Sequence, residues 1–156
     1  MRTIAIDPGF GRCGVAIVEK SGATHTLVYS DCIETDSALP FPARLTAILN
    51  ECSRLIASYA PQTMALEKLY FSNNQKTAMQ VAEVRGALLG LAGMNKLSVF
   101  EYTPGEIKSA LASSGRADKR QVAKMIHLLV KIEKQIRLDD EYDAIAVGIT
   151  HLARTR

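Results

Sequence analysis

The sequence predicts an α/β layer fold with a mixed sheet of about five strands flanked by helices. Three short β-rich segments open the chain, at residues 2–7, 14–19 and 24–33, and a small-residue turn joins the second to the third. Beyond them, helical and strand-like segments alternate, as is typical of α/β layers. With 156 residues the chain is about one domain long.

The later elements follow from apolar periodicity and from turn residues. Within 41–59, apolar residues recur at spacings of three and four, which indicates one buried helical stripe, and Ala60-Pro61 ends it. Two further short apolar segments, 63–67 and 97–102, are expected to be strands. The remaining segments are expected to be helices: 73–95, 104–112, 118–130 and 140–153.

Composition excludes several classes of protein. Hydrophobic residues make up 47% and charged residues 22%, which is ordinary for a globular protein. No apolar run approaches the roughly 20 residues that a membrane span needs, so no membrane partner is expected. The three cysteines are widely spaced and form no CxxC motif, which favours a reduced, cytoplasmic protein.

Positive charge is concentrated in one segment. The whole chain has a net charge of +3, yet residues 104–137 hold eight Lys and Arg against three Asp and Glu. Such a basic stretch fits a polyanionic partner, although a solvated helix face has the same composition.

Two predicted strands end in the same pattern, IAID at 4–7 and MALE at 64–67. Side chains alternate along a strand, so each terminal acid shares its face with a small alanine. If the strands are parallel neighbours, Asp7 and Glu67 emerge together at the sheet edge where α/β proteins build their sites. Two such acids repel each other unless a cation lies between them, which suggests a divalent metal.

A second pair of acids opens the last helix. Asp140 and Asp143 are three residues apart and therefore lie on one helical face. Acids at a helix start also cap free N–H groups and complement the helix dipole, and this alternative stays open for each Asp. Together with Asp7 and Glu67, however, they form an all-oxygen set of the kind that Mg²⁺ or Mn²⁺ prefers.

Several motifs, in order along nearly the whole chain, resemble the bacterial RuvC Holliday-junction resolvases. They are Asp7-Pro8-Gly9, Leu66-Glu67 with Tyr70 and Asn73, Arg85-Gly86, Phe100-Glu101-Tyr102 with Lys108 and Lys119, and Asp140-x-x-Asp143-Ala144-Ile145-Ala146 through Thr150-His151. The resemblance implies a single RNase H-like nuclease domain over 1–156. It also implies a homodimer and metal-dependent cutting of two opposed strands of a four-way DNA junction, in recombination and repair.

Carried over by position, the catalytic and metal-binding acids are Asp7, Glu67, Asp140 and Asp143, with two Mg²⁺ (or Mn²⁺) per site. Two departures affect this assignment. Asp139 stands beside Asp140, so either is a candidate ligand, although the spacing to Asp143 favours Asp140. Glu141 fills a position where the family usually has a small residue, and it is expected to perturb the site.

The resemblance also indicates the DNA and protein contacts. The DNA-binding residues are expected to be Tyr70 as a wedge at the crossover, Lys108, Arg116, Lys119 and Arg120. Small residues four apart on the long helix, Ala78, Ala82 and Gly86, are expected at the dimer interface. A branch-migration helicase complex is a further expected partner. Glu101 has no expected ligand role, and His127 and His151 are expected on helix surfaces or at an interface.

Two other functions compete with this interpretation. One is a module that grips branched nucleic acid without cutting it, although its acids would repel phosphate unless metal sits among them. The other is a fragment of an actin-like or sugar-kinase-like ATPase, in which Gly9, Gly11 and Gly14 would cradle phosphate. That class needs two related domains, and the chain supplies about one.

Overall fold

A five-stranded mixed sheet forms the centre of the molecule. The computed structural model describes residues 1–68, 75–112 and 118–155. The strands are β1 (Arg2–Asp7), β2 (Arg12–Ser21), β3 (Thr24–Glu34), β4 (Thr63–Glu67) and β5 (Ser98–Tyr102), in the order β3-β2-β1-β4-β5. The first three run antiparallel, whereas β4 is parallel to both β1 and β5. The predicted fold class is confirmed.

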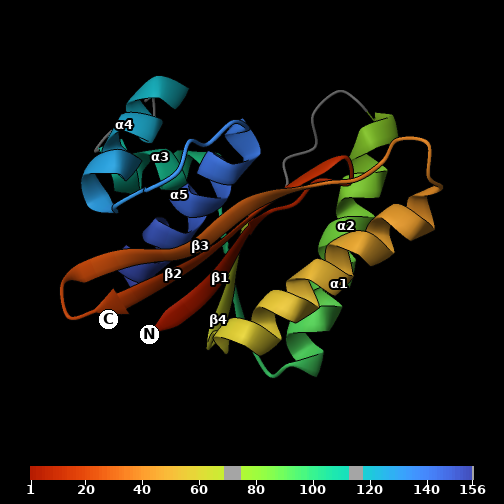
Figure 1. The fold of residues 1–156 in the computed structure, drawn as a ribbon, viewed down its shortest axis with the longest axis horizontal. Coiled ribbons are helices and arrows are strands. Elements are labelled where there is room, and N and C mark those ends of the chain that lie inside the picture. The colour runs from red at the N-terminus through yellow and green to blue at the C-terminus, as the bar shows by residue number, and fades with distance from the viewer. Residues whose placement is uncertain (69–74, 113–117, 156) are drawn as a thin grey trace.

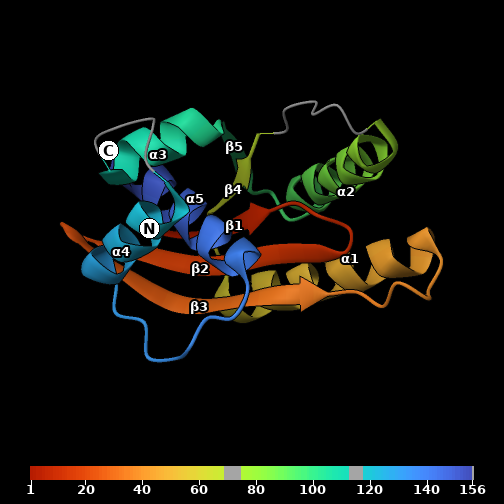
Figure 2. The ribbon, with the colours of Figure 1, turned by 90° about the horizontal axis from the view of Figure 1, so that it is seen from above.

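Helices cover both faces of this sheet. On one face lie α1 (Phe41–Tyr59) and α2 (Gln75–Met94), and on the other lie α3 (Pro104–Ala112), α4 (Lys119–Leu129) and α5 (Asp139–Arg154), as Figure 1 and Figure 2 show from two directions. No helix in the described part of the chain is long and apolar enough to cross a membrane.

The two faces of the sheet differ in side-chain size. Large residues such as Ile4, Ile6 and Met64 pack against α1 and α2, whereas the alternating alanines Ala5 and Ala65 pack against α5. Small side chains on this face let the helix approach closely. The approach is close at Gly148 of α5, where a β-carbon would lie 2.7 Å from a methyl group of Val18 and 3.1 Å from Ala5 Cβ.

The last turn of α5 is fixed by a buried histidine. His151 is fully buried, so the expectation of a surface or interface residue is wrong. Its Nε2 lies 3.0 Å from the hydroxyl of Thr63, and its Nδ1 lies 2.9 Å from the hydroxyl of Tyr102. Both strands β4 and β5 thereby hold this end of the helix, and burial lowers the pKa of the imidazole.

Candidate active site

Asp7 and Glu67 lie side by side at the ends of two parallel strands. The register of β1 and β4 pairs Ala5 with Ala65 and Ile6 with Leu66, so the next residue of each strand is an acid. Because side chains alternate, both acids project on the alanine face, where α5 packs. The parallel pairing predicted from the two strand motifs is confirmed.

The start of α5 brings a second pair of acids to the same place. The helix begins directly above β2 at Gly14, where a β-carbon would lie 1.8 Å from the carbonyl oxygen of Asp140. A side chain at this strand position would push the helix away, so glycine is what permits the approach. Asp140 and Asp143 are thereby presented toward Asp7.

Burial and mutual repulsion raise the pKa values of Asp7, Glu67 and Asp143. Burial raises the pKa of Asp7 to about 8, and the charges of Glu67, Asp143 and Asp140 add to this effect, in that order. Burial also raises the pKa of Glu67 and of Asp143, and Asp143 contributes to the shift at Glu67. The cluster therefore has more negative charge than its surroundings stabilise, which is the condition that a bound cation relieves.

Two basic side chains lie against the acids. Lys119 Nζ is 3.2 Å from Asp139 Oδ2 and 3.6 Å from Asp143 Oδ2, and the hydrogen bond to Asp139 is the main cause of the raised pKa of this lysine. Arg12 Nη1 lies 3.9 Å from Asp140 Oδ2. Asp139 is 73% exposed and Asp140 only 27%, so Asp140 is the one of the two that lies with the buried acids.

A small pocket opens beside Glu67 and Asp143. Its volume is about 220 Å³, and Lys108 from α3 and Lys119 from α4 line it together with the two acids. The pKa of Glu67 is raised overall, but the positive charges of both lysines oppose this rise, which shows that they lie near its carboxylate. Cations and carboxylates thus share one concave surface at the sheet edge.

The donor set fits a hard divalent cation. Four carboxylates supply oxygen ligands alone, which suits Mg²⁺ or Mn²⁺ better than softer metals. Within residues 1–68, 75–112 and 118–155, no three His, Cys, Asp or Glu side chains converge closely enough to form a preassembled metal cage. The acids nevertheless lie near enough to shift one another's pKa, because charge interactions act over longer distances than ligation does.

Other residues singled out from the sequence fall in different places. Arg120 is exposed on α4, Gly86 is exposed on α2, and Ala78 and Ala82 are partly buried there. Tyr70 and Arg116 lie outside the described residues. Glu101, for which no ligand role was expected, forms an ion pair with Arg85 at 2.7 Å.

Glu141 does not enter the acid cluster, so the expected perturbation is not seen. Its side chain is buried on a different side of the first turn of α5, where Ser30 Oγ donates a hydrogen bond of 2.6 Å to Oε1. The physical reason is that neighbouring helical residues point about 100° apart, so Glu141 and Asp140 face different surroundings.

The sequence did not predict that Arg12 and Gly14 would contribute to this acidic site. An isolated glycine inside a strand pattern signals close backbone approach, and this signal was available at Gly14. Arg12 offers no such signal, because its proximity to Asp140 depends on the packing of α5 across β2.

The chain is similar to known proteins over nearly its whole length. The chain matches the family model described as crossover junction endodeoxyribonuclease RuvC over residues 3–151. A relative of that name from Brachyspira hyodysenteriae is 38% identical over 156 residues, covering 100% of this chain and 96% of the relative. Another, from Moorella thermoacetica, is 43% identical over 152 residues, covering 97% and 90%.

Solved structures extend the similarity to three dimensions. RuvC of Thermus thermophilus in complex with a Holliday junction substrate superposes with a TM-score of 0.91 at 28% identity, covering 97% of this chain and 93% of that one. Because the match covers 97% of this chain, it includes helices on both faces of the sheet. On the family model and the curated relatives, this chain belongs to the RuvC family of crossover junction endodeoxyribonucleases.

Proposed function

We propose that this protein is a metal-dependent endonuclease that resolves four-way DNA junctions in recombination and repair. The observation that carries the proposal is the meeting of Asp7 and Glu67, at two parallel strand ends, with Asp140 and Asp143 at the start of α5. Membership of the RuvC family supports the substrate class. Neither the non-cleaving module nor the ATPase fragment is favoured by these observations.

Two Mg²⁺ ions per site, or Mn²⁺ in their place, are the cofactors we assign. Asp7 would contribute to both ions, Glu67 to the first, and Asp140 with Asp143 to the second. When bound, such ions activate a water molecule for attack on phosphorus and offset negative charge on the leaving oxygen. The chain itself contributes a partly buried carboxyl group, Asp7, whose pKa of about 8 makes it hold a proton at neutral pH until a cation approaches.

Lys119 is the basic residue best placed to act on the scissile phosphate. Its ammonium group already lies among the acids, at 3.6 Å from Asp143, and it remains largely exposed to an incoming strand. A fixed positive charge there would stabilise the negative charge that grows on the phosphate oxygens. Lys108, which lines the same pocket, would hold the strand by its backbone phosphate.

Further DNA contacts extend from this pocket along the basic segment. Arg120 is exposed beside Lys119 and is suited to phosphate contact, and we assign Arg116 the same role. We assign Tyr70 to stacking on an unpaired base at the crossover, an interaction worth about 1–3 kcal/mol per base.

A homodimer formed through α2 is the assembly we propose. The buried side of the helix carries Val84, Leu88 and Ala92, whereas its other side exposes Gly86 and Gly90, with open space where a β-carbon would be. Ala78 and Ala82 continue the row of small residues. A two-fold dimer would present equivalent sites to the two equivalent strands of a junction.

The remaining assignments concern a further partner, the domain organisation and the location. A branch-migration helicase complex is the partner we propose beyond the junction and the second protomer. We also take residues 1–156 as a single nuclease domain, because both apolar cores share one sheet. Three free cysteines suit a cytoplasmic location.

A synthetic four-way junction tests the function directly. The protein is incubated with junctions labelled on each strand in turn, with Mg²⁺ or with a chelator, beside a linear duplex of the same sequence. Symmetric nicks near the crossover that need Mg²⁺ and do not occur in the duplex are the expected result. Binding without cutting under every metal condition would instead favour the non-cleaving module.

A further inference from the structure

The first turn of α5 is tied to two other segments by a buried acid. The side chain of Glu141 is only 7% exposed. It accepts a hydrogen bond of 2.6 Å from Ser30 Oγ and forms an ion pair with Lys134 Nζ at 2.7 Å. Lys134 Nζ also donates to the carbonyl oxygen of Ser30 at 2.6 Å. The three residues form a closed set, called here the Ser30–Lys134–Glu141 cluster, which joins β3, the segment before α5 and α5 itself.

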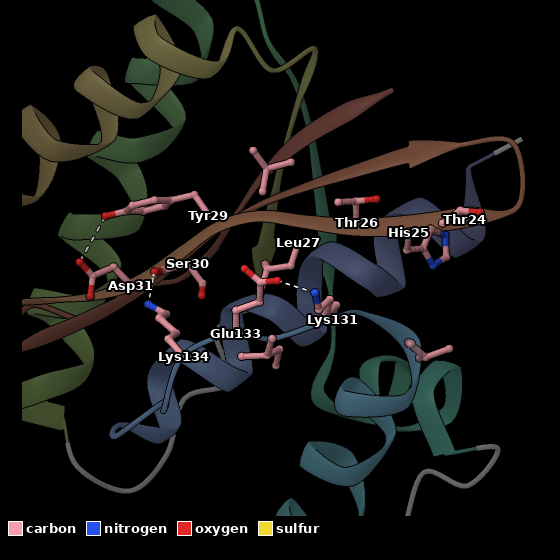
Figure 3. A pocket seen from close by; sticks show the side chains of 13 residues that line it. Thr24, His25, Thr26, Leu27, Tyr29, Ser30, Asp31, Lys131, Glu133 and Lys134 are labelled. Atoms are coloured by element: carbon pink, nitrogen blue, oxygen red, sulfur yellow. Dashed lines mark hydrogen bonds and ion pairs between the residues drawn. The ribbon is translucent and has the colours of Figure 1, made fainter.

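Figure 3 shows the outer part of this cluster. Lys134 extends from the segment that precedes α5 toward Ser30 on β3, at one end of an open groove of about 880 Å³. Its neighbour Lys131 turns to Glu133 on the surface instead. Two lysines of one short segment thus have different surroundings, since one lies in solvent and the other contacts a buried carboxylate.

The other side-chain contacts at the start of α5 are more exposed: Lys119 with Asp139 and Arg12 with Asp140 both lie at the surface. The residue before the helix, Leu138, makes no side-chain capping bond, although the N-cap of α4, Asp118, makes a full capping box. A helix start without a cap leaves N–H groups unsatisfied and tends to fray. In α5 the bonds of Glu141 to β3 and to Lys134 hold this turn in place, and the same turn carries Asp140.

We propose that the Ser30–Lys134–Glu141 cluster is a positioning device for the metal-binding carboxylates. It fixes the first turn of α5 against β3, so that Asp140 and Asp143 face Asp7 and Glu67. Glu141 and its partners do not touch the reacting groups, and they act through the position of the helix. This inference rests on the proposed function, since it takes these four acids as the metal ligands.

The test separates position from stability by replacing both charged partners. In K134M/E141M, two methionines fill the space without leaving a buried charge, so the melting temperature in chelator is expected to stay near the wild-type value or rise. Affinity for Mn²⁺, measured on the protein without DNA by electron paramagnetic resonance, is expected to fall roughly 10-fold, as when residues that orient metal ligands are changed. K131M is the matched control, with no expected change in either quantity.

Two further variants keep the test decisive. If K134M/E141M does not fold, S30A removes one hydroxyl from the cluster and K134R keeps the charge. Weaker Mn²⁺ binding in S30A, with binding near wild type in K134R, supports the proposal. Wild-type Mn²⁺ affinity in a folded K134M/E141M, or in S30A if the double variant fails, overturns it.

The same titration distinguishes failure of the positioning role from failure of the function. If wild-type protein binds Mn²⁺ and D7N does not, the acid cluster is the metal site, and an unaffected K134M/E141M then refutes the positioning role alone. If wild-type protein binds no Mn²⁺ and cuts no junction, both proposals fail.

Discussion

The carbonyl oxygen of Asp140 lies against the α-carbon of Gly14, at a point where a β-carbon would come within 1.8 Å of it. A backbone atom of a helix cannot give way as a flexible side chain does. The start of α5 and the strand β2 are therefore held at a separation that only glycine permits.

Gly14→Ala should therefore reduce junction cleavage by about 100-fold, because an ångström-scale displacement of a catalytic group costs that much. The displaced groups would be Asp140 and Asp143. Cleavage rate and melting temperature should both be measured. Gly105→Ala is the control, since the nearest atom there is 4.0 Å away, and it should cut normally. Normal cleavage by Gly14→Ala would mean that α5 can shift without affecting the site.

Asp7→Asn should abolish cleavage while junction binding persists. The amide keeps the shape of the carboxyl group but removes a charge that the metal ions need. Cleavage is measured with Mg²⁺, and binding by gel mobility shift in chelator. Cutting by this variant at more than a trace of the wild-type rate would refute the assignment of Asp7 as a ligand.

Stability of the metal-free protein should decrease as pH rises. The pKa of Asp7 is about 8 in the folded protein and about 4 in an unfolded chain, so the folded state binds more protons between these values. The free energy of unfolding contributed by this group is therefore greatest below pH 4 and is lost as pH rises toward 8. Glu67 and Asp143, whose pKa values are also raised, act in the same direction.

Melting temperatures in chelator across this range would measure the effect. Asp7→Asn should flatten the profile and melt at a higher temperature than wild type at pH 8. A wild-type profile in Asp7→Asn would show that the carboxyl group of Asp7 is not the one that titrates.

Lys119→Ala should impair cutting far more than folding. Its ion pair with Asp139 is exposed and its ion pair with Asp143 is partly exposed, so their loss should cost at most about 1 kcal/mol of stability. Loss of a positive charge at the phosphate should lower the cleavage rate by about 100-fold. Lys119 also lowers the pKa of Asp7 and Glu67, so its removal should raise both pKa values, and the acids should become ionised and support cleavage only at a higher pH. Lys124→Ala, on the exposed side of the same helix, is the control and should behave as wild type.

Local sequence patterns predicted much of the fold correctly. Phe41–Tyr59, Thr63–Glu67 and Pro104–Ala112 have the bounds expected from apolar periodicity and from the prolines around them. The acid motifs at 4–7 and 64–67 also predicted the neighbouring strand ends, because strand alternation fixes which face each side chain takes.

Long-range partners could not be predicted in this way. Glu141 is 111 residues from Ser30, and His151 is 88 residues from Thr63. Whether a polar side chain is buried depends on whether such a distant partner satisfies it. Nothing in the local sequence distinguishes Glu141 from the exposed Asp139, so its burial became evident only from the packed structure.

Helix α5 is fixed near both of its ends, by Glu141 at one and by His151 and Gly148 at the other. Its 16 residues span about 24 Å. Loosening the His151 end would let the helix pivot about its other attachment, so the aspartates would rotate in place and not translate. Suppressor mutations for a damaged active site in this protein should therefore be sought at the far end of the sheet as well as around the acids themselves.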